Sequence, residues 1–115
     1  NTLKIAEGAD LLLHDALSLP TLTALSGALA AAGQTRQSKI VTDVMDYHAS
    51  TGSLVALGEQ SNVAMVAYYH LVPVPPNAIL KTIFMRGAPD NFVLTEDRMW
   101  FELPAHSDEI VVHRP

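Results

Sequence analysis

The chain contains no cysteine among its 115 residues. A disulfide framework, a thiolate zinc site and a cysteine nucleophile are therefore excluded, and a metal would have to bind to His, Asp or Glu. Basic residues are also few, since seven Lys and Arg stand against twelve Asp and Glu, for a formal net charge of -5. Because general binding to nucleic acid depends on clustered positive charge, a nucleic-acid partner is disfavoured.

Long hydrophobic runs are absent as well. The longest candidate, Val63 to Tyr69, is followed directly by His70 and is much shorter than the roughly 20 apolar residues of a membrane-spanning helix. The first segment carries Lys4 and Glu7, where a secretory signal peptide would be apolar. The sequence thus predicts no membrane partner, and both a cytoplasmic and a periplasmic location fit it.

The residues that are present have the composition of one globular domain. Hydrophobic residues make up 49% of the chain and charged residues 17%, which is enough for a single core of ordinary size. No internal repeat and no linker divides the sequence. We therefore expect one domain over residues 1–115.

Apolar spacing predicts an alternation of strands and helices after a short opening helix. Continuous apolar runs indicate a strand over Ala9–Leu13, ending at His14 and Asp15, and a buried strand over Val63–Tyr69. Helical spacing and capping residues predict helices over residues 21–32, 34–46, 51–61 and 77–85. Short strands are predicted over residues 92–94, 99–103 and 109–113. This order is typical of an α/β domain with helices packed against a sheet.

Polar residues follow both of the main predicted strands. Asp15 comes after the first strand and His70 after the second, while His48 stands between two predicted helices. Side chains at the carboxyl ends of strands meet at one edge of an α/β sheet. A neutral His there can bind a divalent metal, and a carboxylate can orient a second His that acts as a general acid. A hydrogen-bonded structural role is the alternative for each of these residues.

Two neighbours of these residues are assigned structural roles. Because adjacent residues on a strand point to opposite faces, we expect His14 to face away from Asp15. Tyr69 lies in the second predicted strand, and we expect it in the core.

Three segments carry a resemblance to a known family: Leu11–Ala16, Asp46–Thr51 and Val66–Pro73. They resemble the C-terminal half of the metallo-β-lactamase-fold hydrolases, in the branch that is similar to ribonuclease Z and arylsulfatase. In that branch one strand ends in a His-Glu-Ala triplet, a His-Ser-Thr-like segment opens a helix, and the next strand ends in a metal-binding His. The resemblance covers roughly residues 1–85. It implies the C-terminal half of an αββα sandwich, with a mixed sheet and flanking helices.

The resemblance implies a role for three residues. His70 would be a zinc ligand, His48 would protonate the leaving group, and Asp15 would orient His48. Asp15 stands where the family has the longer Glu, and Ala49-Ser50 stands where Ser-Thr is common. The family's other ligands, a His-rich segment with an adjacent Asp and a bridging Asp, precede the matched part and are absent from these residues.

The implied activity is that of a metal-dependent hydrolase. A zinc-activated hydroxide would attack a small-molecule ester, phosphodiester or sulfate ester, with two zinc ions in the full-length protein. One His cannot hold a zinc ion that needs three or four protein ligands, so we expect this segment alone to be inactive. The competing hypothesis is a non-catalytic α/β binding or assembly domain in which Asp15, His48 and His70 form a hydrogen-bond network.

The resemblance also implies a partner for the sheet. Two sheets pack face to face in the family's fold, so one sheet face would lack a cover in half a molecule. We expect that face to carry Val63, Met65 and Ala67 or their alternating neighbours. The cover would be the N-terminal half of the same protein or, in a homodimer, a second copy of the chain.

Overall fold

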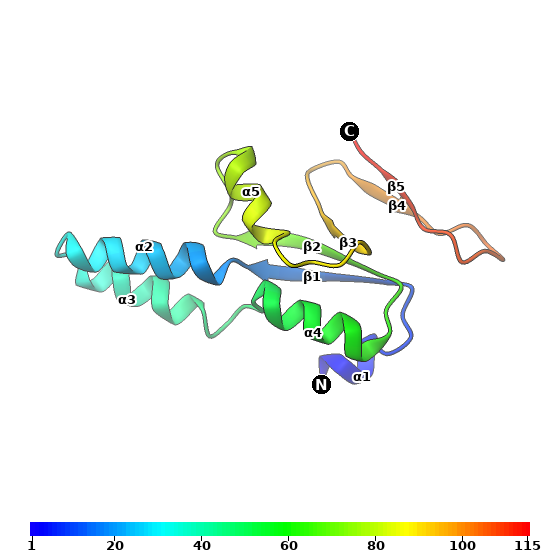
Figure 1. Ribbon diagram of the computed structural model, residues 1–115, viewed down its shortest axis with the longest axis horizontal. Helices are drawn as coiled ribbons and strands as arrows, with labels where there is room; N and C mark the ends of the chain where they lie inside the picture. Colours follow the sequence, from blue (N-terminus) through cyan, green and yellow to red (C-terminus); the bar gives the residue numbers. More distant parts are fainter.

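The computed structural model describes residues 1–115 as a mixed α/β arrangement (Figure 1). Its elements, in chain order, are α1 (Thr2–Ala6), β1 (Leu11–Leu17), α2 (Leu19–Ala31), α3 (Thr35–Val44), α4 (Thr51–Ser61), β2 (Met65–Val72), α5 (Ala78–Phe84), β3 (Phe92–Leu94), β4 (Trp100–Glu102) and β5 (Val111–His113). Strands β1, β2 and β3 form a parallel sheet in that order, and β4 and β5 form a separate antiparallel pair. The predicted α/β class is confirmed, but the implied mixed sheet is wrong, because the three-stranded sheet is parallel throughout and the antiparallel pair is separate from it.

Helix α4 packs against the sheet and anchors the core. The Ser50 side chain caps its first turn by accepting a hydrogen bond from the Ser53 backbone N–H at 3.2 Å. Leu54 of α4 is buried in one cluster with Tyr68 of β2 and other apolar residues of β1, α5 and β3. Gly58 allows the close approach, because a Cβ there would lie 2.8 Å from the Phe92 ring. The start of α4 is therefore held rigidly beside the sheet.

Both main strands run further than the apolar runs predicted. β1 continues to Leu17 and β2 to Val72, so His14, Asp15 and His70 lie within strands rather than after them. Apolar residues follow the polar ones in both strands, and the parallel pairing of β1 with β2 therefore continues to Leu17 and Val72. The expected placement of these three residues after the strand ends is thus corrected.

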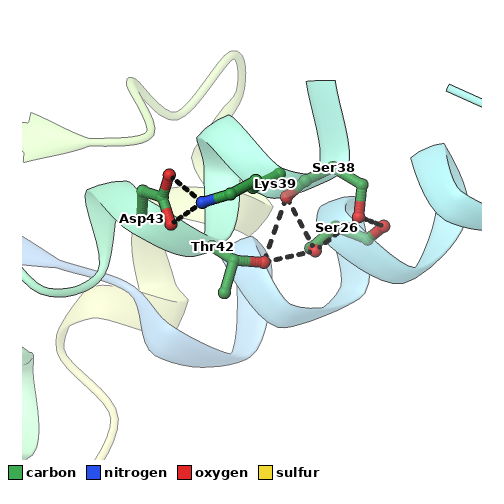
Figure 2. A network of polar contacts seen from close by, with 5 residues as sticks. All are labelled: Ser26, Ser38, Lys39, Thr42 and Asp43. Carbon is green, nitrogen blue, oxygen red and sulfur yellow. Dashed lines mark hydrogen bonds and ion pairs between the residues drawn. The ribbon is translucent and has the colours of Figure 1, made fainter. Parts of the chain in front are cut away.

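Helices α2 and α3 form a hairpin that extends beyond the carboxyl end of β1 (Figure 1). Polar contacts join them: the Ser26 hydroxyl lies 3.0 Å from the Ser38 hydroxyl and 2.9 Å from that of Thr42 (Figure 2). On the surface of α3, Lys39 and Asp43 form an ion pair at 2.8 Å. No residue of α3 is buried, so apolar packing contributes little to this hairpin.

The first turn of α2 differs from the sequence-based prediction. The helix begins at Leu19 after the N-cap Ser18, with Pro20 inside the first turn, rather than at Thr21 after a proline connection. Proline fits there because the first turn does not use its backbone N–H groups for helical bonds. Even α2, which has 13 residues, does not meet the length and apolarity that crossing a membrane requires, and neither does any other helix.

The exposed apolar residues of the sheet are not those named in the prediction. Val63 and Ala67 are buried, whereas Leu13 of β1 is 52% exposed and Tyr69 of β2 is 50% exposed. Buried Val66 and half-exposed Tyr69 lie three residues apart in β2, on opposite faces of a pleated strand. The prediction is wrong for Val63 and Ala67 and also for the alternating neighbours Val66 and Tyr68, which are buried, while Met65 is partly buried. The assignment of Tyr69 to the core is wrong too.

Candidate active site

The segment between α3 and α4 brings His48 to Asp15. The Leu17 backbone N–H donates to the carbonyl of Ala49 at 2.8 Å, and Leu17 and Ser50 form an isolated parallel bridge. This short pairing places residue 48 beside β1. Nδ1 of His48 lies 2.9 Å from Oδ2 of Asp15. The predicted hydrogen bond between these side chains is confirmed.

The Asp15 carboxylate is held at both of its oxygens. Oδ2 also accepts the Ala49 backbone N–H at 3.4 Å, and Oδ1 lies 2.9 Å from Nδ1 of His14. Burial by itself raises the pKa of Asp15, but the His48 hydrogen bond, the His14 charge and the Ala49 N–H outweigh it and leave the pKa below its ordinary value. Asp15 is therefore ionised at neutral pH and acts as an acceptor.

An ionised Asp15 fixes the orientation of the His48 ring. Because the carboxylate can only accept, Nδ1 of His48 carries the proton of their bond. The Nε2 atom makes no hydrogen bond within the chain, and the side chain is 26% exposed. His48 thus presents a free Nε2 that can take up or release a proton at the surface.

A β-bulge positions His70 beside His48. Asp15 pairs with Tyr69 and Ala16 with Leu71, so His70 is an extra residue in β2. Its backbone φ of 43° is left-handed, a conformation that is uncommon for a residue with a Cβ. The His70 ring stacks on that of His48, with the ring centroids 5.5 Å apart. No feature of the sequence around Tyr69-His70 signals this bulge.

Backbone strain at His70 leads to a stability prediction. We expect the chain with His70→Gly to have a higher free energy of unfolding than the chain with His70→Ala, by about 1 kcal/mol, because only glycine is relaxed at a φ of 43°. Both variants lack the imidazole, so their difference isolates the backbone term. Urea unfolding of the two variants measures it.

The control for that comparison is the neighbouring Tyr69. It pairs regularly with Asp15, so Tyr69→Gly should be less stable than Tyr69→Ala by about 0.5–1 kcal/mol. The same order of stability at both positions would contradict the assignment of strain to His70.

His14 does not face away from Asp15, so that prediction is wrong. Its Nδ1 lies 2.9 Å from both the backbone carbonyl oxygen and Oδ1 of Asp15. The bulge has its extra residue in β2, so β1 itself is regular here, and the contact is made by the imidazole of His14 reaching the oxygens of Asp15. Sequence reasoning therefore missed His14 as a member of the site. We call His14, Asp15, His48 and His70 the histidine cluster.

The donor atoms of the histidine cluster do not make a complete zinc site. No three His, Asp or Glu side chains of residues 1–115 are arranged to hold a metal ion. The Nδ1 atoms of His14 and His48 already contact Asp15, whereas a zinc ion needs three or four convergent protein ligands. These residues alone therefore do not fit the implied metal pair, and we assign them no step that passes through it.

Neither cavity of the molecule includes the histidine cluster. The larger, of about 510 Å³, is lined by Lys81 of α5, by β3, and by Met85, Asp90, Glu96 and Arg114. Lys81 Nζ and Arg114 Nη1 lie 3.6 and 3.7 Å from the Glu96 carboxylate, so positive and negative charges are paired there. The side chains of His14, Asp15 and His48 are partly buried, with 22–26% of their surface exposed, and they lie outside both cavities.

No protein-family profile matches this chain, and no curated protein sequence matches it significantly. A function is therefore inferred from the geometry of the histidine cluster and from the resemblance of the three sequence segments.

Proposed function

We propose that the chain carries the acid–base part of the site of a metal-dependent hydrolase with the metallo-β-lactamase fold. The observation that supports this most directly is the hydrogen bond of 2.9 Å between Asp15 and His48. It leaves Nε2 of His48 free, with the ring of His70 stacked beside it. A general acid must keep one ring nitrogen free to meet the leaving group, and Nε2 of His48 meets that requirement.

In this proposal His48 is the general acid. Water adds its oxygen to the carbonyl, phosphorus or sulfur centre of the ester, and the bond to the leaving-group oxygen breaks. Protonated His48 gives its Nε2 proton to that oxygen and afterwards takes up the proton that the water loses. Asp15 keeps the ring oriented and stabilises the imidazolium form by its negative charge.

His70 has a different role in the proposal, as a single ligand to zinc. The remaining ligands of the two zinc ions would come from the N-terminal half of the full-length protein. The half-exposed Leu13 and Tyr69 on the sheet support such a second half, because a packed sheet would cover them in an αββα sandwich. The parallel sheet with its helices would then be the C-terminal half of that sandwich.

Metal retention tests the proposal. In the full-length protein, His70→Ala should weaken metal retention at least about 10-fold, since even loss of an outer-shell partner has effects of that size. His48→Ala should leave the metal content at the wild-type value. The assay pairs metal analysis of dialysed protein with hydrolysis of p-nitrophenyl acetate, bis(p-nitrophenyl) phosphate and p-nitrophenyl sulfate. Equal metal content in wild type and His70→Ala, or no hydrolysis of any of the three esters, would overturn it.

A further inference from the structure

The two oxygens of the Asp15 carboxylate have different partners. Oδ2 faces His48 Nδ1 at 2.9 Å and the Ala49 N–H at 3.4 Å, whereas Oδ1 faces His14 Nδ1 at 2.9 Å. The His14 contact plays no part in the proposed proton transfer, yet it is as short as the contact to His48. It therefore calls for a physical explanation of its own.

His14 ties the Asp15 side chain to the Asp15 backbone. Its Nδ1 lies 2.9 Å from the carbonyl oxygen of Asp15 as well as 2.9 Å from Oδ1. Because Nδ1 lies within contact distance of both oxygens, it opposes rotation of the Asp15 carboxylate away from its position beside His48.

We propose that His14 is a positioning residue that locks the Asp15 carboxylate in the rotamer that faces His48. Its expected effect on catalysis rests on the proposed function above, whereas its effect on the orientation of His48 does not. The contact stands out on β1, because neighbouring side chains of a strand ordinarily point to opposite faces and the extra residue of the bulge lies in β2, not in β1.

Two substitutions separate the hydrogen bond of His14 from its bulk. His14→Asn keeps an N–H donor close to the place of Nδ1, and His14→Leu fills a similar volume without any donor. Circular dichroism checks that both variants fold. If His14→Leu does not fold, His14→Ala takes its place in the comparison.

The first readout uses the 115-residue chain and is independent of activity. Nitrogen NMR shifts of the His48 ring report which ring nitrogen carries the proton. We expect a single Nδ1-protonated form in the wild type and in His14→Asn, and a mixture of both neutral forms in His14→Leu. An unchanged His48 ring in His14→Leu overturns the proposal.

The second readout is turnover in the full-length protein. His14→Leu should lower the turnover number by about 10- to 100-fold with little change in KM, and His14→Asn should restore it. If His48→Ala is impaired but His14→Leu turns over as fast as wild type, the positioning role of His14 is overturned and the proposed function is not. Undiminished turnover in His48→Ala overturns the proposed function instead, so the two failures are distinguishable.

Discussion

Replacing His48 with Ala is expected to lower the turnover number of the full-length protein by about 10²- to 10⁴-fold, the usual contribution of a positioned general acid. The leaving-group oxygen would have to depart without the proton that Nε2 of His48 supplies. Metal content should not change, because His48 contacts Asp15 through Nδ1 and is assigned no metal in the proposed site. Steady-state kinetics with the best of the three test esters, together with metal analysis, measures both quantities.

His113 offers a matched control for this substitution. Its Nε2 lies 2.9 Å from Oε2 of Glu102, and its ring stacks on Trp100 with centroids 3.7 Å apart. It is thus another His that is paired with a carboxylate and stacked on a ring, but it lies on β5, outside the parallel sheet. His113→Ala should leave turnover unchanged. A His48→Ala protein with wild-type turnover would refute the assignment of His48 as the acid.

The elements that depend on local sequence could be predicted, and those that depend on pairing between distant strands could not. The predicted bounds of α4, residues 51 to 61, are those observed, because the Ser50 cap and the helical spacing of Leu54 are local signals. The end of β1 was placed too early because His14 and Asp15 are polar. The ladder with β2 nevertheless holds these residues in the strand.

The histidine cluster also combines a contact that could be predicted from the sequence with positions that could not. The resemblance predicted the contact between Asp15 and His48, and the bridge between Leu17 and Ser50 is its structural cause. The position of His70 depends on the bulge in β2, which is a property of the pair of strands, and the contact of His14 with Asp15 runs against the alternation expected along β1. Neither strand read alone contains a Gly or Pro that would have indicated the bulge.

Asp15→Asn should reduce turnover by about 10²- to 10⁴-fold, although the side chain keeps nearly the same size. The amide lacks the negative charge that stabilises the imidazolium form of His48. It also presents an NH₂ group that competes for the place of the accepting Oδ2, so the ring is no longer held with its proton on Nδ1. Turnover near the wild-type value in Asp15→Asn would show that the carboxylate does not support catalysis.

The same variant should also change how the stability of the 115-residue chain depends on pH. The pKa of Asp15 in the folded chain lies below its ordinary value of 3.8, so in acid the unfolded chain binds this proton before the folded chain does. The stability that Asp15 contributes is therefore fully present above pH about 4 and is lost as the pH falls through the folded-state pKa. Urea unfolding should show a steeper acid loss for the wild type than for Asp15→Asn, and parallel profiles at neutral pH. If the two profiles ran parallel through the acid range as well, the ionised carboxylate would not be held by His14, His48 and Ala49 as the structure has it.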